Sequence, residues 1–272
     1  MGSIDGCAGP EQNVNIFVPS RAVHQPTPTI AELRNTLRAI EGGGKRDHPV
    51  LPFGLDDVDR RLGDGGMRID ALHEVAGEGG NWGDEAAAIL FSAGVAARTS
   101  RPVLWVVRTR DLFAPGLYQA GLAPERVIYA EARDDAELLA LMEEGLRHGG
   151  LGAVVGEAKR VPTPATRRLQ LAAEGGGAIA LLLKRPAQAG GDPFALPSAA
   201  VTRWRVGHAP SQPVPWGGLG PACWRLQCMR QRGGDPFELI VEAADETGRI
   251  SLPARLVDRP APQVGAPQRA VA

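Results

Sequence analysis

The sequence predicts an α/β fold in which helices flank a mostly parallel sheet, with an N-terminal helix before it and a C-terminal antiparallel β extension after it. Two patterns predict this fold. Short apolar runs without polar alternation, such as residues 103–107, recur between helical patterns, which is typical of strands covered on both faces. After residue 199 the helical patterns stop and apolar residues alternate with polar ones, which is typical of antiparallel strands.

The composition is that of an ordinary globular protein, since 43% of the 272 residues are hydrophobic and 22% are charged. The net charge of −1, which divides into −5 over residues 1–183 and +4 over the remainder, excludes a global attraction to nucleic acid. Arginine outnumbers lysine 27 to 3. This excess suits phosphate or carboxylate recognition, but it also fits codon bias in a GC-rich genome.

Location and redox state follow from what the sequence lacks. No apolar run reaches the roughly 20 residues that span a bilayer, and the N-terminus has no signal-peptide pattern, so we expect a cytoplasmic protein without membrane contact. Cys7, Cys223 and Cys228 do not have the spacing of metal ligands. They are predicted to be free thiols in a reducing compartment, and no metal site is expected.

An N-terminal helix is predicted within residues 29–50, after a disordered tail over residues 1–28. Thr29 and Glu32 form the Thr-x-x-Glu pattern of a capping box. An aliphatic stripe at helical spacing consists of Ile30, Leu33, Leu37 and Ile40. Because a glycine run separates this helix from the rest, we expect its stripe to dock on another chain; packing on its own domain is the alternative.

The predicted core spans residues 51–186 and opens with a short amphipathic helix over residues 51–67. A strand then starts at residue 72 and ends in a glycine-rich turn. The further elements expected in order are a helix at 86–97, a strand at 103–107, a short helix at 118–121, a strand at 127–130, a helix at 135–147, a strand at 151–155, a helix from 163 that glycines 175–177 stop, and a strand at 178–183.

Residues 187–258 are predicted to form a loop and the antiparallel extension, and residues 259–272, rich in Pro, Ala and Gln, a disordered tail. Strands are expected at 201–206, 224–230 and 237–242. The last two form a hairpin because the turn Gly233-Gly234-Asp235-Pro236 separates them.

The glycine-rich turn of the core is the main candidate site. It comprises Gly77, Glu78, Gly79, Gly80, Asn81, Trp82, Gly83 and Asp84. A phosphate-binding loop ends in Lys and Ser/Thr, which hold phosphate and magnesium, but Gly83 and Asp84 stand at those places. A Lys roughly 4 Å from a phosphate charge is worth about 4 kcal/mol at an effective dielectric of 20. Two interpretations stay open: a phosphate loop that has lost its ligand, or an ordinary strand-turn-helix junction.

The order of these pieces resembles the RecA/Rad51 ATPase core, and more closely the ImuA family, which comprises RecA-like, SulA-related accessory proteins of bacterial mutagenesis cassettes. The resemblance covers residues 29–258 and rests on an ordered set of short motifs. They are Gly54-Leu55, Val58-Asp59, Leu62-Gly63 and Gly65-Gly66 before Glu74 and the loop, then Val154-Val155-Gly156-Glu157, Arg167-Arg168-Leu169-Gln170-Leu171-Ala172-Ala173-Glu174, Leu181-Leu182-Leu183-Lys184-Arg185-Pro186 and Trp224-Arg225-Leu226.

The resemblance implies a RecA-like fold without its hydrolytic chemistry. Gly156 and Glu157 end the fourth strand, where a magnesium-coordinating Asp is expected. Arg108-Thr109-Arg110 end the second strand, where RecA carries the Glu that activates water. With the altered loop, these departures predict that the chain is not an enzyme and has no catalytic residue, cofactor or metal.

For function, the resemblance implies a non-catalytic adaptor in SOS-induced mutagenic translesion DNA synthesis. Its expected partners are ImuB, a Y-family polymerase relative, and an error-prone C-family DNA polymerase, with RecA as a third candidate. Two alternatives stay open. One is a SulA-like inhibitor of cell division, and the other is an unorthodox ATPase that binds nucleotide through Arg108, Arg110 or Lys184.

Five arginines of the C-terminal strands are candidates for direct, weak DNA contact: Arg203, Arg205, Arg225, Arg230 and Arg232. Trp204 and Trp224 are interleaved with them. Because successive side chains of a strand point to opposite faces, Arg203 and Arg205 share one face and Trp204 lies on the other. The alternative interpretation is a solvated arginine face over a core filled by tryptophan.

Overall fold

The computed structural model describes the following parts of the chain: Thr29, Glu32, Thr36, and residues 48–186, 190–214 and 218–253. The chain divides into two compact units, residues 1–43 and residues 44–272. Each unit is described by itself. No helix within these described parts combines the length and apolarity that crossing a membrane requires.

In the first unit, the described residues Glu32 and Thr36 are helical, which agrees with the prediction at these two positions. The predicted capping box is also confirmed. The Thr29 N–H donates to the Glu32 carboxylate (2.7 Å), and the Glu32 N–H donates to the Thr29 hydroxyl (3.3 Å). The stripe and the two predicted tails lie outside the described residues: Ile30, Leu33, Leu37, Ile40, residues 1–28 and residues 259–272.

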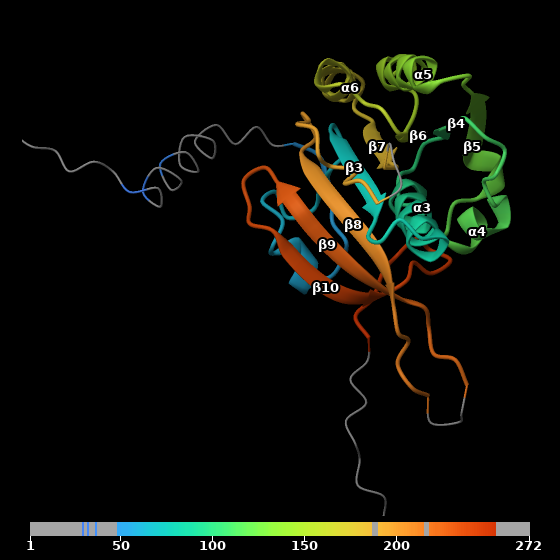
Figure 1. Ribbon diagram of the computed structural model, residues 1–272, viewed down its shortest axis with the longest axis vertical. Helices are drawn as coiled ribbons and strands as arrows, with labels where there is room; N and C mark the ends of the chain where they lie inside the picture. Colours follow the sequence, from blue (N-terminus) through green and yellow to red (C-terminus); the bar gives the residue numbers. More distant parts are fainter. Residues whose placement is uncertain are drawn as a thin grey trace, which may run out of the picture. The chain divides into compact units, whose positions relative to one another are not determined.

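The second unit is built on an eight-stranded sheet with the order β10-β9-β8-β3-β7-β6-β4-β5 (Figure 1). The strands are β3 (Leu72–Gly77), β4 (Val103–Val107), β5 (Val127–Glu131), β6 (Ala153–Ala158), β7 (Ile179–Lys184), β8 (Thr202–Ala209), β9 (Cys223–Gln231) and β10 (Phe237–Glu242). From β8 to β5 neighbouring strands are parallel, whereas β9 runs antiparallel to both β8 and β10. This arrangement confirms the predicted α/β fold with its antiparallel C-terminal extension.

Helices cover both faces of the sheet (Figure 1). On one face lie α3 (Trp82–Ala97) and α4 (Ala114–Gln119), and on the other α5 (Asp135–Arg147) and α6 (Thr163–Gly176). A short 3-10 helix, η1 (Pro124–Arg126), precedes β5. Alternation along the strands builds the two cores: Trp105 and Leu183 pack toward α3, while their neighbours Val106 and Leu182 pack toward α5 and α6.

The fully buried Trp204 joins the extension to the α3 face of the core. Its ring centroid lies 5.9 Å from that of Phe53, 5.8 Å from that of Phe91 in α3, and 5.8 Å from that of Phe237 in β10. Its indole N–H donates to the Thr202 hydroxyl (2.6 Å), so the polar end of the ring is satisfied as well.

The predicted helix over residues 51–67 is wrong. This segment consists of β1 (Val50–Leu51), the four-residue helix α2 (Asp56–Asp59) and β2 (Met67–Arg68), with β1 and β2 paired antiparallel. The Asp59 carboxylate accepts the N–H groups of Phe53 (2.7 Å) and Gly54 (2.9 Å), which turns the chain back on itself. Gly54 has a φ of +78°, a conformation that glycine adopts without strain.

Two other helices begin earlier than the sequence pattern predicts. The helix predicted from residue 86 begins at Trp82, because the Asn81 side chain caps it by accepting the Asp84 N–H (3.0 Å). The helix predicted at 118–121 spans Ala114–Gln119 instead. Pro115 suits its first turn, and Gly121, with a φ of +88°, follows its end.

Candidate functional site

The glycine-rich loop connects the end of β3 to the start of α3, as the sequence predicts. Loops of this kind direct backbone N–H groups toward an acceptor, because the first N–H groups of a helix have no partner within it. Gly77 allows the loop to lie close to α3, since a Cβ there would come 3.0 Å from the Asp84 backbone. The acceptor in this structure belongs to the chain itself.

That acceptor is the carboxylate of Asp84, whose residue is 4% exposed. One carboxylate oxygen accepts the Gly79 N–H (2.8 Å) and the Asn81 side-chain amide (2.6 Å). The other accepts the His208 backbone N–H (2.9 Å) and lies 2.6 Å from His208 Nδ1. Burial opposes the charge, but the hydrogen bonds from His208 and Gly79 outweigh it and lower the pKa of Asp84 below its usual 3.8. The loop therefore holds an internal anion.

The second acid of the loop, Glu78, is also paired. Its carboxylate lies 3.1 Å from the Arg225 guanidinium of β9. Gly207 of β8 makes room for it, because a Cβ at that position would come 2.0 Å from a Glu78 carboxylate oxygen. Both acids of the loop are thus bound to the C-terminal extension.

The ends of the second and fourth core strands carry ion pairs. Arg108 after β4 lies 2.8 Å from Asp135, and Arg110 lies 2.8 Å from Glu131. In β6, Glu157 is 2.5 Å from Arg185, which is also 2.5 Å from Glu85 of α3. Burial raises the pKa of Glu157, although Arg185 acts in the opposite direction. The single cation of this triad is shared by two carboxylates.

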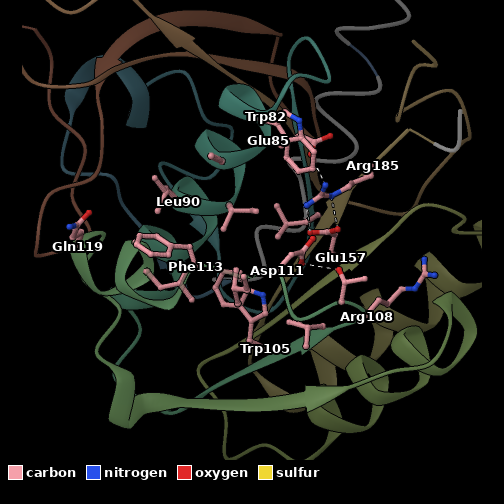
Figure 2. A pocket seen from close by; sticks show the side chains of 18 residues that line it. Trp82, Glu85, Leu90, Trp105, Arg108, Asp111, Phe113, Gln119, Glu157 and Arg185 are labelled. Atoms are coloured by element: carbon pink, nitrogen blue, oxygen red, sulfur yellow. Dashed lines mark hydrogen bonds and ion pairs between the residues drawn. The ribbon is translucent and has the colours of Figure 1, made fainter. Parts of the chain in front are cut away.

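A pocket of about 390 Å³ lies beside this triad, between α3, α4 and the ends of β4, β6 and β7 (Figure 2). Its walls are mainly apolar side chains, among them Leu90, Trp105 and Phe113. The sequence patterns did not predict this pocket. Its residues come from four separate parts of the chain, and no local periodicity marks them as neighbours.

Of the five arginines proposed for DNA contact, three form ion pairs within the chain. Arg203 Nε lies 2.8 Å from the fully buried carboxylate of Glu74, and Arg205 lies 2.8 Å from Asp192. Arg225 is paired with Glu78 as described above.

The remaining two arginines are exposed. Arg230 donates to the Ser198 carbonyl (3.1 Å), and Arg232 lies near the end of the same strand. Trp204 and Trp224 are buried on the opposite side, which confirms the predicted alternation. The arginine face is not simply solvated, because Phe194 lies under the guanidinium groups of both Arg203 and Arg205. DNA contact through the five arginines stays a prediction.

Lys184, which the sequence offered as an alternative nucleotide ligand, lies at the end of β7 and is 6% exposed. Burial lowers the pKa of Lys184, and the negative charge of Glu74 opposes that shift. Glu74, Lys184 and Arg203 thus form a group of charged side chains, and Arg203 also donates to the carbonyls of Phe194 (3.0 Å) and Leu196 (2.6 Å). No sequence motif indicated that these three side chains meet.

Comparison with known proteins identifies relatives over most of the chain. Two proteins named Protein ImuA, from Caulobacter vibrioides strains NA1000 and CB 15, are each 41% identical over 229 residues, which cover 81% of this chain and 93% of each relative. No protein-family model matches the chain. The crystal structure of SulA from Pseudomonas aeruginosa is 26% identical, with a TM-score of 0.35, and the match covers 41% of this chain and 95% of SulA.

The substitution Asp84→Asn is expected to lower the free energy of unfolding by about 1–3 kcal/mol at pH 7, because the loop and His208 lose a charged acceptor. Since folding lowers the pKa of Asp84, the stabilising effect of its charge is fully present above pH 3.8. This effect is lost as the pH falls through the pKa that Asp84 has in the folded protein. Urea unfolding at pH 7, 5 and 3 measures this.

The exposed Glu246, replaced by Gln, serves as the control and should change stability little at any of the three pH values. If Asp84→Asn lowers the free energy of unfolding by the same amount at pH 7, 5 and 3, the result contradicts the assigned role of the carboxylate.

Proposed function

The chain belongs to the ImuA family, and we propose that it is a non-catalytic adaptor in SOS-induced mutagenic translesion DNA synthesis. One observation carries the non-catalytic part of this proposal: the Asp84 carboxylate accepts the Gly79 N–H, the Asn81 side-chain amide and the His208 N–H, so these donors are not free for a nucleotide phosphate. An adaptor of this kind uses the fold as a scaffold for partners rather than for hydrolysis.

Electrostatics supports the loss of nucleotide binding. Two like charges roughly 4 Å apart repel by about 4 kcal/mol at an effective dielectric of 20. A phosphate at this loop would meet Asp84 in the donor positions and would have no lysine ammonium from position 83. Arg185, the cation of the triad, is already shared by Glu85 and Glu157.

The partners that we propose are an ImuB-like Y-family protein, an error-prone C-family DNA polymerase and RecA. The resemblance to the ImuA family supports this set. The identity of 41% extends over 81% of the chain.

Genetics tests the adaptor function. Deleting the gene should reduce the frequency of DNA-damage-induced mutations to that of a strain without the ImuB-like protein, and the double deletion should reduce it no further. The reason is that an adaptor and its partner act in one step. Normal induced mutagenesis in the deletion strain, with a changed frequency of filamentous cells after damage, would instead support the division-inhibitor alternative.

We predict no magnesium-dependent ATP hydrolysis and no micromolar ATP affinity, because three separate positions lack the groups for phosphate, magnesium and water activation. The double substitution Gly83→Lys with Asp84→Thr should not restore turnover, since Arg108 to Arg110 and Glu157 remain as they are. Calorimetry with magnesium-ATP and a phosphate-release assay measure both. Micromolar binding by the wild type would contradict this prediction.

We also propose that the helix with the stripe Ile30, Leu33, Leu37 and Ile40 docks on another chain. Burying four aliphatic side chains at about 1.5–3 kcal/mol each gives a gross 6–12 kcal/mol, from which immobilising the helix subtracts a large part. Micromolar association is therefore expected. Leu33→Asp with Leu37→Asp should abolish association with the partner or with a second copy, while the thermal midpoint changes little.

The control for this experiment is Asn35→Asp, which adds a charge on the opposite side of a helix with 3.6 residues per turn. It should leave association intact. A sharp fall in the thermal midpoint of the Leu33, Leu37 variant with unchanged association would show that the stripe packs on its own domain.

A further inference from the structure

The pocket between α3 and α4 has an apolar end and a charged end (Figure 2). The apolar end is built from Leu90 of α3, Trp105 of β4, and Phe113 and Leu117 at α4. Pockets of 300–1,000 Å³ hold drug-sized ligands, so a volume of about 390 Å³ suits a few side chains rather than a folded domain.

The charged end carries more carboxylates than it can neutralise. Glu85 and Glu157 share the guanidinium of Arg185, and Asp111 lies beside them (Figure 2). The Asp111 carboxylate accepts the Thr109 hydroxyl (2.8 Å), which carries no charge. Arg108 also lines the pocket, but it is paired with Asp135. Three carboxylates therefore face one available cation, which disfavours an anionic ligand and favours a cationic one.

The rim of the pocket exposes two aromatic side chains. Trp82 at the start of α3 is 81% exposed, and Phe113, just before α4, is 70% exposed. Exposed tryptophan and other large aromatic residues are characteristic anchors of protein interfaces. A small molecule within the cavity would leave most of the outer surface of these rings in water, whereas a polypeptide that crosses the mouth would cover them.

We propose that this pocket is a docking site for a short segment of a partner protein that inserts a bulky apolar side chain and places an arginine or lysine close to it. The apolar side chain packs against Leu90, Trp105 and Phe113. The cation meets Asp111 and the carboxylates that share Arg185. The partner's backbone crosses the rim formed by Trp82 and Phe113.

This inference gives the proposed adaptor a partner-binding surface and rests on that function only in so far as an adaptor needs one. Peptide binding can fail while the gene still supports induced mutagenesis, so failure of the docking site and failure of the adaptor function are distinguishable.

The test is selection of a phage-displayed library of random twelve-residue peptides on the full-length protein. The variant Trp82→Ala with Phe113→Ala is used for counter-selection. Both residues are largely exposed, so the double variant is expected to fold. The peptides that depend on the pocket should share a large apolar residue with an arginine or lysine within a few positions. Fluorescence polarisation then measures the affinity of the selected peptides.

Three variants locate the binding. Trp82→Ala with Phe113→Ala should weaken the selected peptides about tenfold or more, and Asp111→Lys should weaken them to a similar extent by placing a cation at the charged end. Gly116→Leu should also block binding. A Cβ at Gly116 would already lie 3.2 Å from the Phe113 ring and 3.4 Å from Leu90, so the larger side chain fills the cavity.

The matched control is Leu171→Ala, which removes a side chain from a residue of α6 that is 67% exposed, close to the value for Phe113. It should change affinity less than twofold. Circular dichroism identifies any variant that does not fold. If Gly116→Leu does not fold, the test rests on the Trp82, Phe113 double variant and on Asp111→Lys.

Several results would overturn the proposal. One is that no peptide is enriched on the wild type over the rim variant. Another is that the enriched peptides are acidic or uncharged, or that Asp111→Lys leaves their affinity unchanged. Binding of magnesium-ATP that these pocket variants abolish, without peptide enrichment, would assign the pocket to a nucleotide instead.

Discussion

The hydrogen bonds that the Asp84 carboxylate accepts are the interactions on which the glycine-rich loop and its contact with the extension depend. A glycine-rich loop before a helix presents N–H groups that have no partner within the helix. Asp84 supplies the acceptor from the first turn of α3. The same carboxylate also accepts the His208 N–H, so it joins the loop to β8, the strand that pairs with β3.

Acid-arginine pairs extend this connection. Glu74 and Glu78 lie on or beside β3, whereas their partners Arg203 and Arg225 lie on β8 and β9. The charge asymmetry of the sequence, −5 over residues 1–183 and +4 over the remainder, is thus partly explained by contacts between the two parts. Arginines that are paired with acids of the same chain are less available to bind phosphate, so a high arginine content in the extension is weak evidence for a nucleic-acid surface.

At the ends of the core strands, an ion-paired triad lies directly beside the pocket. Arg185 holds Glu85 and Glu157 together, and this triad closes the charged end of the pocket. A metal ion would have to compete with that guanidinium for the two carboxylates, and a phosphate would have to compete with the carboxylates for the guanidinium. The apolar side chains around Trp105 line the pocket beside it.

The sequence by itself determined the type and order of most elements, because helical and strand periodicity are local. The strand Val103–Val107 and the helix Asp135–Arg147 have the predicted limits. It also placed Arg203 and Trp204 on opposite faces. It did not predict the turn that Asp59 closes within residues 51–67.

The partners of the charged groups were decided only by the tertiary structure. Asp84 and His208 are 124 residues apart, and Arg225 and Glu78 are 147 apart. No local pattern encodes such pairs, because they exist only once the sheet order places β8 beside β3 and β9 beside β8. The sequence showed that Gly83 and Asp84 stand where a phosphate-binding loop has Lys and Ser/Thr, whereas only the folded chain shows which groups the Asp84 carboxylate binds.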